Sequence, residues 1–581
     1  MHDDGAPNRV QLLPARTAEP PPAPDASGRA VLDAAAAGAN LVVLGAPGTG
    51  KTSLALHLLV DAVASGRDTL LLAPTRARAD MLRRRSAHLL GEAGVRDGAV
   101  RVRTPAGYAL TVLRTSLTRR PDPLPAPVLL AGAEEDAALA ALIVPEQWPG
   151  LPASAVASRA FRTELRNLLA RAGELGLSAD DLAELGRVLS VPVWGPASAL
   201  LRIWDAQGRP SAERRSQTRR MDAARLQDRA VEALGSWEAD RVAERRPVPD
   251  LVVVDDYQDC TAATARLLAA LAMPDADGHR AQAVVLGDPD VAVETFRGGA
   301  PSLLVEAEDR SGLNASRLLL RTAHRGTRAL DAVWWDQAGR LPVTGSAAHR
   351  RPVRPAPSRG ARPPGAGTPG RAPGAGEEVA VRVASSPAQE AAHVARMLRG
   401  EHVLHGTAWD RMAVILRSVG RMQAACRELR RRGVPLAGTS PAVLLRAEPA
   451  SGALLTTARA ALEGRLGEAD RLPERPSAMA LLTSPLIGLS ALDLRRLRRR
   501  LRADRPAERV PDEILLSVLA SPQEADALTE ELDEGPLAEQ AGLLARAARV
   551  VAALRGVVGQ VQAPAAGRDD ADDAAAGAGV R

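Results

Sequence analysis

The chain has 581 residues, a formal net charge of +6 and a hydrophobic fraction of 46%. This length predicts three or four domains, and an apolar content dominated by alanine and leucine, with only 2% aromatic residues, favours helix over sheet. The two cysteines, Cys260 and Cys426, are too few for a disulfide framework, a four-cysteine metal site or an iron–sulfur cluster. The sequence contains no long uncharged apolar run and no leader pattern, so we expect a cytoplasmic protein with no membrane partner.

The first elements along the chain predict an α/β fold. Residues 1–26 are rich in proline and are predicted to be disordered. A short helix at 30–32 is followed by an apolar strand at 41–44, a glycine-rich loop, a helix at 51–64 and a second apolar strand at 69–73. Strand, loop, helix and strand in this order form a βαβ unit with parallel strands.

The glycine-rich loop has the pattern G-x-x-x-x-G-K-[ST], which binds the phosphates of a nucleotide. It consists of Gly45, Ala46, Pro47, Gly48, Thr49, Gly50, Lys51 and Thr52. Lys51 is the only lysine among 75 lysine and arginine residues. A coding bias toward arginine explains the other 74, and the one lysine that remains indicates that arginine is not tolerated at this position. A compact ammonium reaches between the β- and γ-phosphates, where a planar guanidinium does not fit. We expect ATP and Mg²⁺ here, and a glycine-rich turn without a ligand is the weaker alternative.

Residues 121–245 are predicted to form a helical insertion. Three stretches have apolar residues at a spacing near 3.6: 134–143, 158–172 and 219–243. After residue 249 the pattern of buried parallel strands resumes at 251–254, 283–286 and 317–320. One sheet is therefore expected to be built from residues 27–120 and 246–340, on either side of the insertion.

The remaining chain is predicted to contain a linker, a second domain and a helical region. Residues 341–376 have almost no large apolar side chain, which predicts a flexible linker. A second domain is expected to begin within 377–440, with a helix, a strand and a helix at 387–398, 412–416 and 424–431. Residues 441–562 are predicted to be mostly helical, including 491–501, and the tail at 563–581 is predicted to be disordered.

Two carboxylates follow the apolar strand at 251–254. Asp255 is placed to hold Mg²⁺ beside the hydroxyl of Thr52, and Asp256 is placed to activate water. An ordinary polar strand end is the alternative, and the preceding phosphate-binding loop disfavours it.

These motifs and their order resemble the UvrD/Rep group of superfamily 1 DNA helicases. The second motif of that group reads Asp-Glu-Tyr-Gln-Asp, against Asp-Asp-Tyr-Gln-Asp at 255–259 here. Segment 73–77 resembles the motif that contacts single-stranded DNA, and 104–109 resembles the Thr-Phe-His segment beside it. Segment 287–299 resembles motif III, whose aromatic ring stacks on a base, and the pair at 324–325 resembles the Tyr-Arg pair at the adenine and γ-phosphate.

The resemblance implies a P-loop (RecA-like) motor domain with helical insertions and an incomplete second motor domain, within an α/β fold. It implies an ATP-dependent 3′-to-5′ DNA helicase or translocase of repair and recombination, which acts on single-stranded and duplex DNA. When the roles of the family's motif residues are carried over to the matching positions, the catalytic residues are Asp256, Gln258 and Arg325. The Mg²⁺ ligands are then Thr52 and Asp255. The residues of the phosphate-binding loop, together with Ser53 and His324, are expected to contact the nucleotide. The residues expected to contact DNA are Thr75, Arg76, Thr104, Phe296 and Arg297.

Segments 161–166 and 484–498 are further similar to the A-type subunit of actinobacterial AdnAB-type helicase–nucleases. This similarity implies a second helicase–nuclease subunit as a partner.

The sequence also departs from the family pattern. Asp256 stands where the family has a longer glutamate, Val291 replaces a glutamine of motif III, and His324 replaces a tyrosine. Gly28 lies near the place of the adenine-reading glutamine. We therefore expect a slow motor.

No Thr-x-His-x-x-Lys-Gly segment and no Thr-Arg-Ala-Arg segment follows residue 440. We expect the chain to be an N-terminal portion that lacks motifs V and VI and the nuclease. Two alternatives stay open: a non-catalytic ATP- and DNA-binding subunit of a helicase–nuclease complex, and a P-loop nucleotide kinase or other ATPase, which the DNA-contact motifs disfavour.

Overall fold

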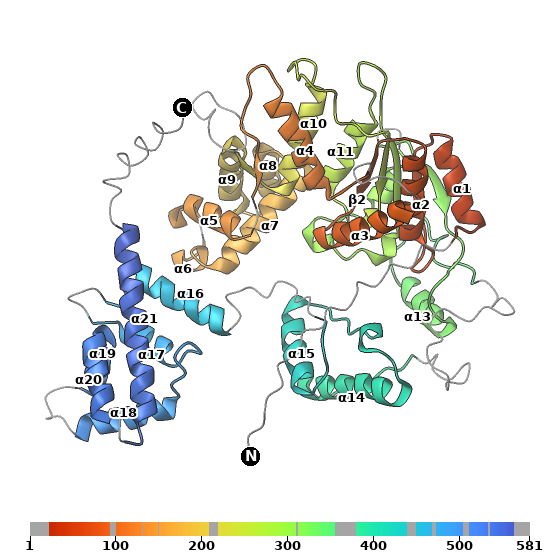
Figure 1. Ribbon diagram of the computed structural model, residues 1–581. Helices are drawn as coiled ribbons and strands as arrows, with labels where there is room; N and C mark the ends of the chain where they lie inside the picture. Colours follow the sequence, from red (N-terminus) through yellow and green to blue (C-terminus); the bar gives the residue numbers. More distant parts are fainter. Residues whose placement is uncertain are drawn as a thin grey trace, which may run out of the picture. The chain divides into compact units, whose positions relative to one another are not determined.

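The computed structural model describes residues 23–92, 100–130, 132–148, 150–207, 219–309, 312–354, 379–437, 449–467, 472–503, 510–532 and 535–562. The chain divides into two compact units, which are described separately (Figure 1). The first contains the described residues up to Ala380 and the second those from Val381 on. The predicted disordered segments, except residues 23–26, and the larger part of the predicted linker lie outside the described residues.

A parallel sheet of six strands forms the centre of the first unit, in the order β3-β2-β6-β7-β1-β8. The strands are β1 (Leu41–Leu44), β2 (Thr69–Leu72), β3 (Val100–Arg103), β6 (Leu251–Val254), β7 (Gln282–Gly287) and β8 (Ser316–Leu319). Residues of β1, β2, β6 and β7 are buried throughout, which is why these strands are almost entirely apolar; Thr69 and Gln282 are the buried polar residues at the starts of β2 and β7. The α/β parallel fold is confirmed. The strands predicted at 41–44 and 251–254 have the predicted bounds.

Helices cover both faces of this sheet (Figure 1). Alternate residues of a strand point to opposite faces. Val42 and Leu44 of β1 pack with α4 (Pro105–Thr118), α10 (Ala223–Gly235) and α11 (Ala262–Ala272). Leu41 and Val43 pack with α1 (Ala26–Ala36), α2 (Lys51–Ala64) and α3 (Arg76–Glu92). The sheet is therefore the middle layer of three.

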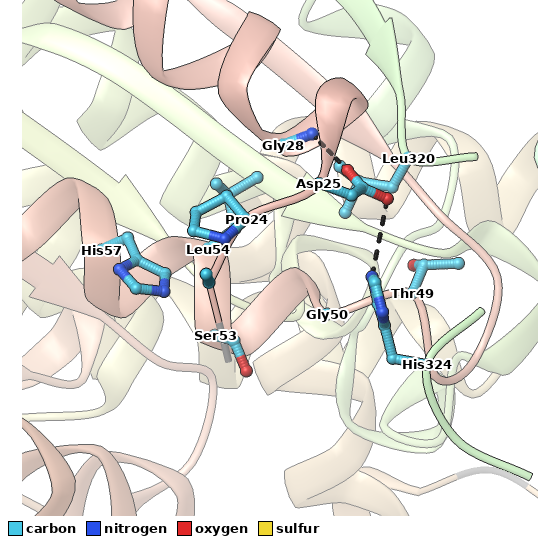
Figure 2. A pocket seen from close by; sticks show the side chains of 11 residues that line it. Pro24, Asp25, Gly28, Thr49, Gly50, Ser53, Leu54, His57, Leu320 and His324 are labelled. Atoms are coloured by element: carbon cyan, nitrogen blue, oxygen red, sulfur yellow. Dashed lines mark hydrogen bonds and ion pairs between the residues drawn. The ribbon is translucent and has the colours of Figure 1, made fainter. Parts of the chain in front are cut away.

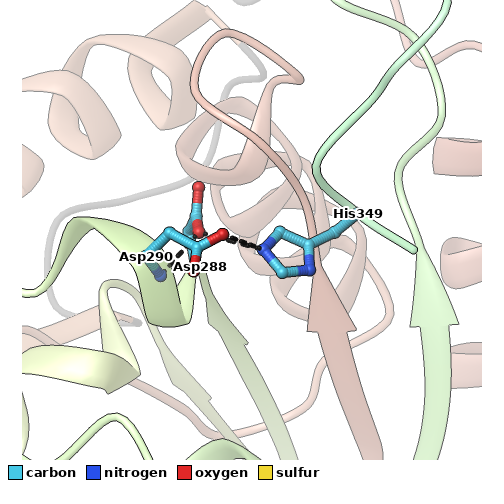
Figure 3. Close-up of side chains that lie close together, drawn as sticks. All are labelled: Asp288, Asp290 and His349. Carbon is cyan, nitrogen blue, oxygen red and sulfur yellow. Dashed lines mark hydrogen bonds and ion pairs between the residues drawn. The ribbon is translucent and has the colours of Figure 1, made fainter. Parts of the chain in front are cut away.

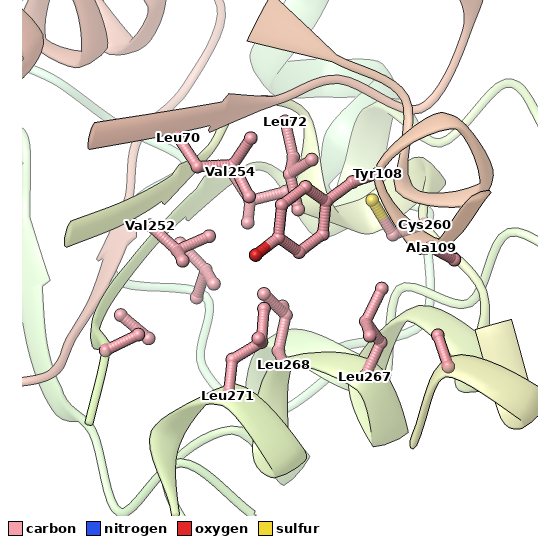
Figure 4. Close-up of a cluster of buried hydrophobic side chains, with 14 of the residues drawn as sticks. Leu70, Leu72, Tyr108, Ala109, Val252, Val254, Cys260, Leu267, Leu268 and Leu271 are labelled. Carbon is pink, nitrogen blue, oxygen red and sulfur yellow. The ribbon is translucent and has the colours of Figure 1, made fainter. Parts of the chain in front are cut away.

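Tyr108 of α4 fills the centre of one of these two layers (Figure 4). Its ring lies among leucine and valine side chains of β2, β6 and α11, including Leu72, Val254 and Leu267. Its hydroxyl donates a hydrogen bond to the carbonyl of Pro247, so the one polar atom of this buried ring is satisfied. Burial raises the pKa of Tyr108 well above its usual value, and the ring stays neutral.

The insertion is closed by a short parallel pair of strands, β4 (Val128–Leu129) and β5 (Arg220–Met221). Between them lie α5 (Ala133–Leu142), η1 (Pro145–Gln147), α6 (Ala153–Val156), α7 (Arg159–Leu175), α8 (Ala179–Val188) and α9 (Trp194–Gln207). The helix predicted at 219–243 is wrong at both ends. Residues 220–221 pair with β4, Asp222 then caps α10 by accepting a hydrogen bond from the N–H of Arg225, and the helix ends at Gly235.

The first unit continues past β8 with α13 (Arg328–Ala338) and a connector, which we define as residues 341–354. The sequence predicts a flexible linker from residue 341 on, and this prediction is wrong for the connector. His349 and Arg350 are only 2% and 8% exposed, and Val353 forms a β-bridge with Thr322. A segment whose few large apolar side chains, Leu341, Val343 and Val353, are exposed is thus held in place by polar contacts.

The regular elements of the second unit are all helices within the described residues. The helices α14 (Pro387–His405) and α15 (Val419–Arg431) share a small core of Ala395, Leu429 and Val434. A separate core joins α16 (Pro449–Leu462), α17 (Arg475–Leu482), α18 (Ala491–Ala503), α19 (Pro511–Ala520), α20 (Pro522–Leu532) and α21 (Ala538–Gln562).

The strand predicted at 412–416 is wrong, because no described residue of the second unit pairs with this apolar run, and Ile415 is 92% exposed. None of the helices in the described ranges combines the length and the hydrophobicity of a membrane span.

Leu267 provides a test of the core in Figure 4. Replacing this fully buried side chain with alanine leaves a cavity beside Tyr108, which should destabilise the first unit by about 2–5 kcal/mol. Six of the seven tryptophans lie in this unit, so urea unfolding followed by tryptophan fluorescence reports on it. Met273→Ala, at an exposed position just after α11, is the matched control and should leave the midpoint unchanged. Equal midpoints for the two variants would contradict this account of the core.

Candidate nucleotide and DNA site

The phosphate-binding loop joins β1 to α2. Gly48 and Gly50 have φ angles of +86° and +91°, which glycine adopts without the steric penalty of a Cβ. The Lys51 Nζ donates hydrogen bonds to the carbonyls of Gly45 at 2.5 Å and Ala46 at 3.1 Å. Burial lowers the pKa of Lys51. The ammonium therefore lies over the loop itself, beside the amino end of α2, where a helix attracts phosphate.

Thr52 and Asp255 are brought together as the sequence predicts for a magnesium site. The Thr52 hydroxyl donates a 2.9 Å hydrogen bond to Asp255 Oδ2, and Asp255 is completely buried at the end of β6. Burial, and then the charge of Asp256, raise the pKa of Asp255. Its Oδ1 is buried without a hydrogen-bond partner among the described residues. A hydroxyl beside an unpartnered carboxylate oxygen is a donor set that fits Mg²⁺.

Arg78 is a site residue that sequence reasoning missed. Its guanidinium lies 2.6 Å from Asp256 Oδ2 and 3.7 Å from Asp255 Oδ2. Thr75 and Arg76, predicted to contact DNA, lie just before it: the Thr75 hydroxyl accepts a hydrogen bond from the Arg78 N–H, and Arg76 is exposed. Since β2 and β6 are parallel neighbours, the helix after β2 must begin beside Asp255. That adjacency is set by the strand order of the sheet, which the sequence does not give.

Gln258 and Asp259 connect the acidic strand end to the loop after β7, which we call the 288–298 loop. Gln258 is buried, and its Oε1 accepts a 3.1 Å hydrogen bond from the N–H of Asp288. Asp259 Oδ1 accepts hydrogen bonds from the N–H groups of Val293 and Glu294 at 2.7 and 2.9 Å. Gln258, predicted to be catalytic, thus supports this loop. Asp259 was not predicted.

His324 lies against the phosphate-binding loop (Figure 2). Its N–H donates a 2.9 Å hydrogen bond to the Gly48 carbonyl, and its Nε2 lies 3.5 Å from Asp25 Oδ2. Asp25 also accepts a hydrogen bond from the N–H of Gly28, at the start of α1. A small cavity of about 30 Å³ opens here, and Ser53 is among its lining residues.

Arg325 is exposed, and its main chain lies against Gly48: a Cβ on that glycine would be 3.2 Å from the Arg325 carbonyl.

Phe296 and Arg297 lie together on the surface of the 288–298 loop. Phe296 is 70% exposed, and the Arg297 guanidinium carbon is 5.1 Å from the centre of its ring. Arg171 of the insertion supports this loop by donating a 2.8 Å hydrogen bond to the Thr295 carbonyl. Thr104, also predicted to contact DNA, caps α4 through a hydrogen bond from the Gly107 N–H. An open aromatic ring beside a guanidinium can stack on a nucleobase.

Residues 28–311 match the family model of the UvrD/REP helicase N-terminal domain. Residues 28–311 form a UvrD-like domain. A search of curated proteins found no match to the chain. The UvrD-like domain includes the phosphate-binding loop, the acidic end of β6 and the exposed ring of Phe296, whereas His324 and Arg325 lie just beyond the matched residues.

Glu174 is a buried carboxyl that packs against Gly298, at the end of the 288–298 loop. It lies on α7, is 9% exposed, and its Oε2 has no hydrogen-bond partner within the described ranges. Burial raises its pKa to about 7, from an ordinary value of 4.5. Gly298, with φ +98°, packs against it, since a Cβ there would lie 3.3 Å from Glu174 Cγ. Larger residues are excluded at this turn.

Glu174 should make the stability of the first unit depend on pH. Its carboxyl is harder to ionise in the folded chain, so stability is lost as pH rises from about 4.5 to 7. Glu174→Gln should therefore stabilise the unit relative to the unchanged chain at pH 8, by up to about 3 kcal/mol, and much less at pH 5. The measurement is urea unfolding at both pH values. The control, Glu164→Gln, is exposed on the same helix and should shift the midpoint little at either pH. An equal effect of Glu174→Gln at both pH values would exclude this assignment.

Proposed function

We propose that the chain is an ATP-dependent DNA translocase or helicase. The observation that carries the proposal is the meeting of Lys51, Thr52 and Asp255 at one edge of the sheet of a UvrD-like domain. The exposed ring of Phe296 in the same domain supports DNA as the substrate. By resemblance to the family, we further propose 3′-to-5′ movement, a role in repair and recombination, and a second helicase–nuclease subunit as partner.

In this proposal the phosphate-binding loop grips the triphosphate. The Lys51 ammonium leaves the carbonyls of Gly45 and Ala46 and reaches the β- and γ-phosphates, while loop N–H groups bind the remaining oxygens. Thr52 and Asp255 hold Mg²⁺, which neutralises phosphate charge when bound. Asp256 orients the attacking water, and Arg325 contacts the γ-phosphate. These roles are typical of P-loop motors, in which catalysis is positioning and charge stabilisation.

The effect of DNA binding reaches the nucleotide site through the residues that follow β6. Asp259 binds two N–H groups of the 288–298 loop, and Gln258 binds a third. A base stacked on Phe296 therefore contacts a loop that is hydrogen-bonded to the residues following β6. This connection gives DNA binding a route to the hydrolysis of ATP.

We also propose that turnover by the 581-residue chain is slow. Asp256 has one methylene less than the glutamate of the family pattern, and its carboxylate is paired with Arg78. It also has a left-handed φ of +56°, a conformation that few residues other than glycine adopt.

The same observations favour a second candidate function, that of a non-catalytic subunit that binds ATP and DNA within a helicase–nuclease complex. Here the pairing of Asp256 with Arg78 would be permanent, and ATP would act as a structural ligand.

The first test compares ATP hydrolysis with and without single-stranded DNA. Lys51→Ala and Lys51→Arg should both abolish turnover, because neither side chain places a compact ammonium at the phosphates. Phe296→Ala should weaken DNA binding by about 1–3 kcal/mol, the usual contribution of one base–aromatic stack, with DNA-independent hydrolysis unchanged. Val293→Ala, exposed on the same loop, is the matched control. An unchanged chain whose hydrolysis does not respond to DNA would refute the proposed function.

The second test separates a slow motor from a scaffold. Asp256→Glu combined with Val291→Gln restores the family pattern at both positions, so a motor should gain turnover while a scaffold should not. The measurement is the maximal rate of DNA-stimulated hydrolysis. Adding Lys51→Ala to the double variant should remove the gain, which excludes a contaminating ATPase. No gain in the double variant favours the non-catalytic function.

A further inference from the structure

A buried cluster of charged side chains joins the connector to the 288–298 loop (Figure 3). His349 Nε2 lies 3.0 Å from Asp290 Oδ2 and 3.3 Å from Asp288 Oδ1. The Arg350 guanidinium binds both carboxylate oxygens of Asp290, each at 2.8 Å. The side chains of Asp288, Asp290 and His349 are almost completely buried. Two residues of the connector thus bind two residues of the loop.

The ligand atoms of Asp288, Asp290 and His349 all lie within 4.8 Å of one another, a spacing that could hold a metal ion. Arg350 argues against a metal, because its guanidinium already uses both oxygens of Asp290. A cation would have to displace this bidentate pair or lie beside a buried positive charge. The charges are balanced without a metal. Burial alone would lower the pKa of His349, but the hydrogen bonds and charges of Asp288 and Asp290 raise it.

We call the contacts of His349 and Arg350 with the 288–298 loop the first clamp, and a second clamp lies four residues after Arg350. Arg354 donates hydrogen bonds to the carbonyls of Arg325 and Gly326, at 3.1 and 3.0 Å, and pairs with Asp331 at the start of α13. Arg325 is the proposed γ-phosphate contact. The connector therefore binds two loops that flank the phosphate-binding loop. Arg350 also donates hydrogen bonds to the carbonyls of Leu341 and Pro342 within the connector, which fixes its guanidinium.

Both gripped loops act on the nucleotide site. The charge of Asp288 favours the protonated form of Lys51, and the Asp288 N–H is bound by Gln258, next to the catalytic aspartates. The far end of the same loop carries Phe296. The connector is the last described segment before the chain continues toward the second unit. The contacts of the connector thus reach the loop that carries both Asp288 and Phe296.

We propose that His349, Arg350 and Arg354 are positioning residues that couple the nucleotide site to the connector. This inference rests on the proposed function for the identity of the nucleotide. Binding of ATP fixes Lys51 and Arg325, the two clamps follow, and the connector becomes more ordered. In the other direction, loss of the connector contacts leaves Asp288 and Asp290 less firmly positioned, although Gln258 and Asp259 still bind the loop, so ATP still binds but DNA accelerates its hydrolysis less.

The experiment uses Arg350→Ala in the full chain, with Arg351→Ala, an exposed neighbour, as the matched control. The DNA-stimulated kcat should fall roughly tenfold in Arg350→Ala, within the range for mutations along a coupling path. The KM for ATP and the Kd for single-stranded DNA should change little. Arg350→Lys should not restore kcat, because an ammonium cannot make the bidentate pair with Asp290. A kcat equal to that of Arg351→Ala, or an equal loss of ATP binding and kcat, would overturn the proposal.

Hydrogen exchange gives a readout that does not require hydrolysis. A non-hydrolysable ATP analogue with Mg²⁺ should slow amide exchange at 349–354 in the unchanged chain and in Arg351→Ala, but not in Arg350→Ala. If Arg350→Ala does not fold, His349→Gln replaces it, since it removes the charge and keeps a polar side chain. If the amide exchange rate at 349–354 of the unchanged chain is the same with and without the analogue, the proposed coupling is overturned. Slowed exchange without any DNA-stimulated hydrolysis refutes the proposed function and leaves the coupling standing.

Discussion

The hydrogen bond between Thr52 and Asp255 depends on the parallel arrangement of the sheet, and the rest of the site depends on it too. Because all six strands run the same way, their carboxyl ends lie at one edge. The segments that follow β1, β2, β6, β7 and β8 therefore supply Lys51, Arg78, Asp255, Asp288 and Arg325 to a common region. An antiparallel strand among them would send its following loop to the opposite edge. The helical insertion between β3 and β6 leaves this geometry intact, because β4 and β5 bring its two ends together.

Charge balance is the second requirement at this edge. Four aspartates lie there, and buried carboxylates are unfavourable unless they are paired or hydrogen-bonded. Arg78 pairs with Asp255 and Asp256, while His349 and Arg350 pair with Asp288 and Asp290. The basic side chains arrive from segments far away in the sequence, so the ion pairs also fix those segments. In the connector this effect replaces a hydrophobic core, which explains how a stretch poor in apolar residues is held.

The sequence predicts those parts of the fold whose signal is local. Strand β6 is an uninterrupted apolar run, and α2 begins at the loop motif, so both have the predicted bounds. The sequence does not show which distant segments pair with one another. Residues 220–221 continue the helical pattern of 223–235, but they pair with β4, some 90 residues earlier. The run 412–416 reads as a strand, but a strand exists only where a neighbour pairs with it.

The same distinction separates the site residues that were predicted from those that were not. Lys51 and Asp255 belong to motifs with fixed spacing. Arg350 lies among prolines, glycines and other arginines and reads as a solvated charge, because its burial is decided by Asp290, 60 residues earlier.

The exposure of Phe296 is best understood from the scarcity of aromatic residues. The chain has two phenylalanines and two tyrosines. Both tyrosines are buried, and Phe161 packs edge to face on Trp148 in the core of the insertion. Phe296 remains open in a loop that is tied by Asp259 and Arg171 on two sides, so its exposure does not result from a loose backbone. A ring held rigidly in water gains free energy only when a flat partner covers it. The same contacts connect the loop to the sheet: Asp259, which accepts two hydrogen bonds from the loop, follows Asp255 by four residues, so a shift of the loop is transmitted to the end of β6.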